Sequence, residues 1–292
     1  MKIFGRHLQR NAADQVSQLT SINFAGVIKR QQHPMFQDAN RWRPLIPNLF
    51  LVLFVGLAIL RFTPGFFDYP AARAINNIAT THSLANQLAT GATYPPLEGI
   101  ILLSLVWYCW FSAIGSILRA HLLSGIMAAV AAGLVAILWQ RMLPSTPKPI
   151  FDTILHIQAP DATAAPDDPA TAFFSGSPSF PSERGTLFAG LAIALFLVQR
   201  RVGLLALACT AGIECCRIWL GLHYPTDVMG SFCLAAGIVW LAAVVGVPRL
   251  GIPFLRWEHA SASTFYMCAF VASYQIAIAF QDVRVLLSQQ LH

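Results

Sequence analysis

Long apolar stretches separated by short polar segments run along most of the chain. A membrane-spanning helix needs about 20 mostly apolar residues. Seven stretches are candidates: 45–62, 96–116, 121–140, 186–200, 203–221, 228–248 and 262–281. The fourth is short unless the residues before Thr186 extend it, and Tyr274 and Gln275 interrupt the seventh. The pattern predicts an all-α fold, a polytopic membrane helix bundle of six or seven transmembrane helices.

The composition agrees with this class of protein. Hydrophobic residues make up 56% of the 292 residues and charged residues only 11%, whereas soluble domains carry about 25% charged residues. The net charge of +6 comes without a long basic run, so no nucleic-acid partner is predicted. All six cysteines lie in apolar runs without zinc-ligand spacing, which predicts small buried side chains and no disulfide framework.

The chain divides into two parts. Residues 1–43 contain seven basic residues and no apolar run of the kind a signal peptide needs, so they are predicted to form a cytoplasmic basic leader. Residues 44–292 form the predicted membrane-embedded domain, and its candidate motifs lie within 141–230.

The basic residues also predict an orientation. With the leader in the cytoplasm, twelve basic residues lie on the inner side, and four of the outer residues belong to the motifs described below. The outer seven are Arg61, Arg73, Arg141, Lys148, Arg184, Arg217 and Arg284. The cytoplasmic excess follows the positive-inside rule. We therefore expect an integral protein of the cell (inner) membrane, with the 141–182 connection and the site on the periplasmic or extracellular face.

The end of the fifth stretch carries the strongest candidate for chemistry. Arg217, His223 and Asp227 follow the pattern Arg-x5-His-x3-Asp. A histidine nucleophile needs one neutral ring nitrogen, and a carboxylate on the other nitrogen fixes that tautomer. Asp227 lies four positions after His223, so both side chains can lie on one face of a helical turn. An arginine fork can hold phosphate oxygens at two points.

This pattern resembles the third motif of the type 2 phosphatidic acid phosphatase superfamily. Residues 179–186, at the start of the fourth stretch, resemble the family's Pro-Ser-Gly-His element. There Ser182 and the backbone amides of a helix start can bind an anion. The family's histidine, taken as the acid for the leaving group, is Arg184 here. Arginine keeps its proton and cannot act as that acid.

The first motif and two further positions complete the resemblance. The segment Arg141-x6-Lys148-Pro resembles the family's Lys-x6-Arg-Pro with the two basic types exchanged. Cys216 stands where the family has a serine, which removes one hydroxyl donor to phosphate.

Three other polar residues leave alternatives open. Glu214 precedes Arg217 by three positions, which favours an ion pair over a catalytic role. His82 and His156, in the outer connections, are alternative sources of the missing proton.

The resemblance implies phosphoryl transfer without a metal or any other cofactor, through a phosphohistidine. His223 would be the nucleophile and Asp227 would orient it. The phosphate-binding residues would be Arg141, Lys148, Ser182, Arg184 and Arg217. The motifs supply four cations and no cluster of carboxylates facing the phosphate.

The missing acid bears on the substrate. Cleavage of a monoester expels a basic alkoxide, whereas cleavage of a diphosphate expels a phosphate group whose second pKa is about 6. We therefore expect a membrane lipid phosphatase whose partner is a lipid phosphate or diphosphate, preferably a polyprenyl diphosphate, among the membrane lipids. The alternatives are a phosphotransferase with a lipid or glycan acceptor, and a catalytically inactive relative that binds phospholipid.

Overall fold

The computed structural model describes residues 45–79, 81–112, 115–142, 146–157, 178–245 and 248–281, and the predicted leader lies outside them. Every regular element in these ranges is a helix, which confirms the all-α class. The elements in chain order are α4 (Leu45–Arg61), α5 (Asp68–Ala79), α6 (Ser83–Ala92), α7 (Pro95–Ser112), α8 (Ser116–Met142), the 3-10 turn η2 (Pro149–Phe151), α10 (Glu183–Val198), α11 (Arg200–Trp219), α12 (Pro225–Val245), α13 (Pro248–Ala260) and α14 (Ala262–Ala277).

Each of the seven apolar stretches corresponds to a helix: α4, α7, α8, α10, α11, α12 and α14. Among the described helices, α8, α11 and α12 are long and apolar enough to cross a membrane, and α6 with α7 gives a fourth span bent by 52°. The exact number of spans therefore stays a prediction. The sequence pattern did not predict α5, α6 or α13, which are short and more polar.

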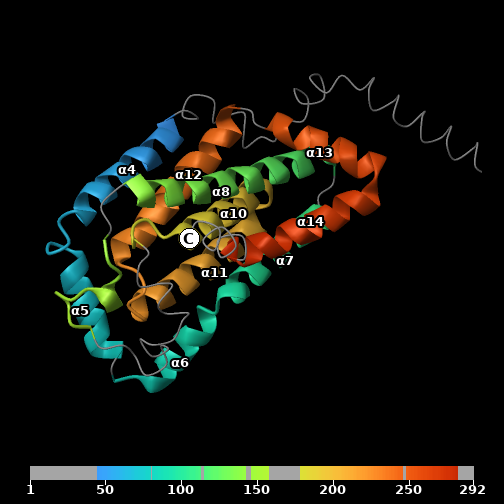
Figure 1. Cartoon of the computed structure of the whole chain (residues 1–292). Helices are drawn as coiled ribbons and strands as arrows, with labels where there is room; N and C mark the ends of the chain where they lie inside the picture. The colour runs from blue at the N-terminus through green and yellow to red at the C-terminus, as the bar shows by residue number, and fades with distance from the viewer. Residues whose placement is uncertain are drawn as a thin grey trace, which may run out of the picture. The chain divides into compact units, whose positions relative to one another are not determined.

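Helix α10 forms the centre of the bundle, in contact with α7, α8, α11 and α12 (Figure 1). Its residues from Gly185 to Leu195 are all buried. A methyl group added at Gly190 would lie 2.8 Å from Cβ of Ala129, so the absence of a side chain lets α8 approach closely. Small residues drive helix association in this way in membranes. A helix enclosed by other helices contacts little lipid. This explains why α10, with 16 residues, can be shorter than a lipid-exposed membrane-spanning helix.

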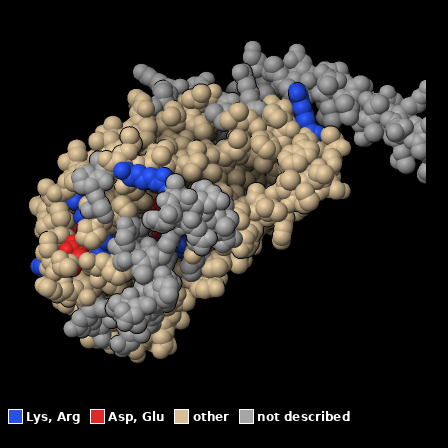
Figure 2. All heavy atoms as spheres, in the orientation of Figure 1, with Lys and Arg blue, Asp and Glu red and all other residues tan. Residues whose placement is uncertain are grey.

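The three motifs lie at one end of the bundle. The C-terminal end of α11, the first turns of α10 and α12, and η2 carry the motif residues, and α4 ends beside them. Figure 2 shows a face made mostly of residues that are neither acidic nor basic, with most of its charged side chains toward the end where Figure 1 places α5. The described remainder of that face carries few charged side chains, as a lipid-facing surface requires.

All six cysteines are free. Cys109 is buried, but Cys215 and Cys268 are exposed, so the prediction of uniformly buried cysteines was wrong for these two. A thiol behaves as a small apolar group, and the outer surface of a membrane bundle accepts such a group as readily as its core does.

Candidate active site

His223 and Asp227 lie together where α11 turns into α12. The turn passes through Gly221, whose positive φ of 71° is a conformation that favours glycine. Nδ1 of His223 lies 3.5 Å from Oδ2 of Asp227, and the His223 side chain is 13% exposed while Asp227 is fully buried. This distance is longer than the usual donor–acceptor distance of a hydrogen bond. Catalytic contacts are often long in substrate-free proteins and shorten in the complex.

The carboxylate of Asp227 is held by several groups. Oδ2 accepts a hydrogen bond from the Ser179 hydroxyl and another, at 2.8 Å, from the backbone N–H of Tyr224. Oδ1 lies 3.4 Å from Nε of Arg61. These contacts fix Asp227 in position beside His223.

Arg61 belongs to this site, although the sequence offered no motif for it. It ends α4, is 4% exposed, and its guanidinium lies 4.2 Å from the centre of the Tyr224 ring. It also approaches Asp68 at 3.9 Å and the Pro147 carbonyl at 3.5 Å, next to the first motif. One signal in the sequence could have found it. Arg61 is one of only three basic residues that the charge count places on the outer side and that belong to no motif. Arg61 joins the first and third motifs.

A second hydrogen-bond network holds the turn between α11 and α12. The hydroxyls of Tyr69 and Tyr224 both donate to Asp152 at 2.9 Å. Asp68 accepts from the Thr226 hydroxyl at 2.6 Å and from its backbone N–H at 3.3 Å. Helix α5 thus anchors the start of α12, and with it the position of Asp227.

Lys148 lies buried among charges from all three motifs. Burial lowers its pKa to about 8. The carboxylates of Glu183 and Asp227 oppose this shift, and the cations of Arg184 and Arg217 add to it. Lys148 therefore lies within electrostatic range of Arg184, Arg217 and Asp227. We call these four residues the charged cluster, and their joint role in binding phosphate stays a prediction.

The second motif forms the first turn of α10. Ser182 is the N-cap, and its side-chain oxygen accepts a hydrogen bond from the backbone N–H of Gly185 at 3.1 Å. The hydroxyl of Ser231 donates to the Ser182 carbonyl at 2.9 Å, which ties this turn to α12. Ser182 itself is fully buried. Its hydroxyl can still donate one hydrogen bond, so its predicted phosphate contact remains a prediction.

Arg184 projects from the same turn toward the C-terminal part of the chain. Its Nη2 donates to Oε1 of Gln281 at 3.2 Å. Gln281 follows the end of α14, so the residue that replaces the family's histidine contacts a segment far along the chain.

Arg217 is held between two buried carboxylates. It donates to Glu214 at 2.5 Å and to Glu98, on α7, at 2.9 Å. The first contact confirms the expected i,i+3 pair, and the second was not predicted. Oε2 of Glu214 and Oε1 of Glu98 are buried without a hydrogen-bond partner among the described residues. Both carboxylates face Arg217, and the expectation that no carboxylate cluster faces the phosphate stays a prediction.

Three predicted or alternative residues lie apart from this cluster. Arg141 is exposed on the last turn of α8, and no hydrogen bond or ion pair joins it to the described site residues. His82 is exposed at the start of α6, where its ring contacts the Ile78 carbonyl at 2.9 Å. His156 is also exposed, although the neighbouring Ile157 lies against Gly221. Within the described ranges, no three His, Cys, Asp or Glu side chains are arranged to hold a metal ion.

Comparison with known proteins places this geometry in a family. Residues 144–249 match the model of the PAP2 superfamily. That range contains Lys148, the second motif and the third motif, and it leaves out Arg141. Part of this membrane protein thus matches the PAP2 superfamily, and the resemblance expected from the motifs is confirmed.

Two individual relatives have low sequence identity to this chain or match it over a short range. The chain is 27% identical over 177 residues to undecaprenyl-diphosphatase BcrC of Bacillus subtilis (strain 168), covering 60% of this chain and 81% of that protein. It is 38% identical over 72 residues to the putative undecaprenyl-diphosphatase YbjG of Escherichia coli (strain K12), covering 22% of this chain and 36% of that protein.

One solved structure is also similar: the first transmembrane PAP2 type phosphatidylglycerolphosphate phosphatase from Bacillus subtilis. The sequences are 19% identical, the TM-score is 0.47, and the match covers 68% of this chain and 94% of that one.

Proposed function

We propose that this protein is a membrane lipid phosphatase that removes a phosphate from a lipid (di)phosphate, with a polyprenyl diphosphate preferred. The proposal rests on one observation: His223 faces Asp227 where α11 turns into α12, and the buried Lys148 lies within electrostatic range of Asp227, Arg184 and Arg217. The PAP2 match supports a lipid phosphatase, and the two relatives named above support a diphosphate substrate.

His223 is the proposed nucleophile. Its Nε2 attacks phosphorus, a P–N bond forms, and the bond from phosphorus to the leaving oxygen breaks with its electron pair staying on that oxygen. Asp227, on the Nδ1 side, orients the ring and stabilises the imidazolium that forms. Water then attacks the phosphohistidine: a P–O bond forms, the P–N bond breaks with its electron pair returning to Nε2, and inorganic phosphate leaves with the protons of the water. Ser179, Arg61 and the Tyr224 amide hold Asp227 in position throughout.

The cations hold the phosphoryl group. Lys148 provides a compact charge, and Arg217 keeps donors for phosphate because Glu98 and Glu214 each engage only one of its terminal nitrogens. The two glutamates fix the orientation of that fork. The amides at the start of α10 add fixed dipoles for the developing charge. Of the first motif, Lys148 is the member placed to contact substrate.

Arg184 supports the choice of a diphosphate. A leaving phosphate group departs without a proton, because its second pKa is about 6. A guanidinium beside it stabilises its charge. Gln281 holds Arg184 in position from the side opposite its own helix. A polyprenyl alkoxide would instead need a proton, which Arg184 cannot supply.

The test is phosphate release by the purified full-length protein in detergent. The substrates are a polyprenyl diphosphate, the matching monophosphate and phosphatidic acid. We expect release from the diphosphate and none from His223→Ala, whose thermal unfolding should match that of the wild type. Retained turnover in the variant would remove His223 from its role. A phosphorylated lipid or glycan acceptor among the products would indicate the phosphotransferase, and no release from any substrate would favour the inactive relative.

A further inference from the structure

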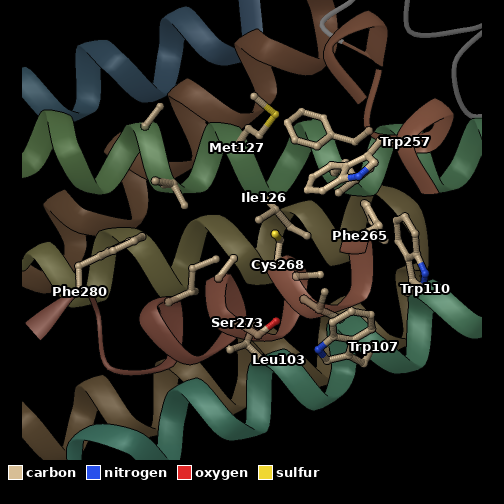
Figure 3. A pocket seen from close by; sticks show the side chains of 18 of the residues that line it. Leu103, Trp107, Trp110, Ile126, Met127, Trp257, Phe265, Cys268, Ser273 and Phe280 are labelled. Carbon is tan, nitrogen blue, oxygen red and sulfur yellow. The ribbon is translucent and has the colours of Figure 1, made fainter. Parts of the chain in front are cut away.

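Helices α13 and α14 lie beyond the residues that match the PAP2 model, apart from Pro248 and Arg249. They fold back along α8 and α7 and enclose an apolar cavity of about 490 Å³ between the four helices. Figure 3 shows side chains from these helices pointing into it. The lining consists of Leu, Ile, Val, Ala, Met, Phe and Trp residues, with Cys268 and Ser273 as the exceptions. No charged residue lines it, so a polar ligand would lose its hydration there without compensation.

Two close helix crossings hold this C-terminal pair in place. A methyl group at Gly99 would lie 2.2 Å from the Ala277 carbonyl oxygen, so α14 crosses α7 in direct backbone contact. A methyl group at Gly251 would lie 2.4 Å from the Ala120 carbonyl oxygen, where α13 crosses α8. Neither contact tolerates a side chain at the glycine. The walls of the cavity are therefore fixed by the backbone.

A polar cluster closes the end of the cavity remote from the phosphate site. Arg119 on α8 pairs with Glu258 on α13 at 3.3 Å. Glu258 also accepts from the Tyr266 hydroxyl at 2.6 Å, and Trp110 donates to that hydroxyl at 3.2 Å. These contacts join α7, α8, α13 and α14 at the level of Trp110, which lines the cavity.

The other end of the cavity leads to the phosphate site along three helices. Phe280 lines the cavity, and the next residue, Gln281, contacts Arg184. On α7, Leu103 lines the cavity about 7 Å along the axis from Glu98, which binds Arg217. On α8, Leu134 lies about 9 Å from Gln140, which donates to the Pro181 carbonyl of the second motif at 2.6 Å.

The cavity is also open to the surrounding bilayer. Among its lining residues Leu134 is 54% exposed, Met127 is 38% exposed and Cys268 is exposed. From Leu123 to Leu134 it extends about 16 Å along α8, roughly half the thickness of the hydrocarbon core. A hydrocarbon chain can thus enter sideways while its head group stays at the membrane surface.

We propose that the cavity bounded by α13 and α14 binds the hydrocarbon chain of the substrate lipid and selects substrates by that chain. The inference rests on the proposed function. The head group occupies the cluster around His223, and the chain runs from Phe280 toward Trp257 between α8 and α14. Because α13 and α14 follow the PAP2-matching range, this chain-binding site is an addition to the phosphatase domain.

The kinetic test uses a matched pair of variants on α14. Ala272 lines the cavity and is exposed, so Ala272→Trp fills the cavity from its open side. Val271, 56% exposed, is the adjacent position outside the lining, and Val271→Trp is the control. The substrates are farnesyl diphosphate and dimethylallyl diphosphate, which share the allylic diphosphate head and differ in the number of prenyl units. Ala272→Trp should lower kcat/KM for the longer substrate about tenfold or more and leave the shorter one unchanged, and Val271→Trp should leave both unchanged.

A binding test separates the two proposals. In His223→Ala, farnesyl diphosphate should protect Cys268 from N-ethylmaleimide without protecting Cys215, which is exposed on α11. Inorganic diphosphate, which lacks the chain, should protect neither. Protection of Cys268 without any turnover by the wild-type protein would leave the cavity assignment standing and refute the phosphatase. Turnover without protection, or an Ala272→Trp effect equal for both substrates, would refute the cavity assignment and leave the phosphatase standing.

Discussion

The buried ammonium of Lys148 gives the proposed phosphatase an alkaline limit. Burial lowers the pKa of Lys148 to about 8. Its cation is therefore present below that pH and is lost as the pH rises through it. The protonated fraction falls from about 90% at pH 7 to about 10% at pH 9. If only the cation holds phosphate, kcat/KM should fall about ninefold over this interval, because kcat/KM reports the ionisation of the free enzyme.

The assay is phosphate release from a polyprenyl diphosphate between pH 6 and 10, with Lys148→Arg as the comparison. Arginine keeps its charge across this range, so the variant should lose the decline near pH 8. Lys148→Met should be slow at every pH and show no such decline. The same alkaline decline in Lys148→Arg would assign it to another group and refute the reasoning.

Four further results are expected. Arg61→Met should destabilise the protein by about 3 kcal/mol, because it removes the cation beside the buried carboxylates of Asp68 and Asp227. Thermal unfolding in detergent measures this, with the exposed Arg73→Met as a control that should change little. Arg184→His should raise cleavage of a polyprenyl monophosphate, by up to about 10²–10⁴-fold, with activity falling as the new histidine loses its proton; no gain would show that another residue supplies the proton. A chelator should leave diphosphate cleavage unchanged, and recovery by added magnesium would contradict this. A cysteine introduced by A165C should react with a membrane-impermeant thiol reagent in intact cells, and protection until lysis would reverse the proposed orientation.

The local features of the fold follow from the sequence. Each apolar stretch forms a helix because a helix satisfies its backbone hydrogen bonds within one segment. The segment can therefore leave water without pairing with a strand. The helix start at Ser182 and the Glu214–Arg217 pair were also predictable, since both depend on spacings of three positions. Short segments such as α5 were not, because their helical state depends on contacts such as the one from Asp68 to Thr226.

The parts of the site that could not be predicted depend on distant pairs. Glu98 meets Arg217 across 119 positions, and Arg184 meets Gln281 across 97. No spacing rule covers such distances, and Arg61 lacks even a motif to mark it. Arg141 shows the converse. It keeps the spacing of the family motif, yet it lies exposed at the end of α8, because helical geometry and not motif spacing sets where its side chain points.

The crossing of α14 over α7 at Gly99 has a consequence for the order in which the protein matures. Chains emerge from the ribosome N-terminus first, so α14 is made after every other described helix. A nascent chain that has inserted α4 to α12 already contains His223, Asp227 and Lys148, but Arg184 still lacks Gln281. Newly made molecules therefore pass through a stage in which the residues of the proposed site are inserted, but the Arg184–Gln281 contact and the α14 wall of the cavity are still missing.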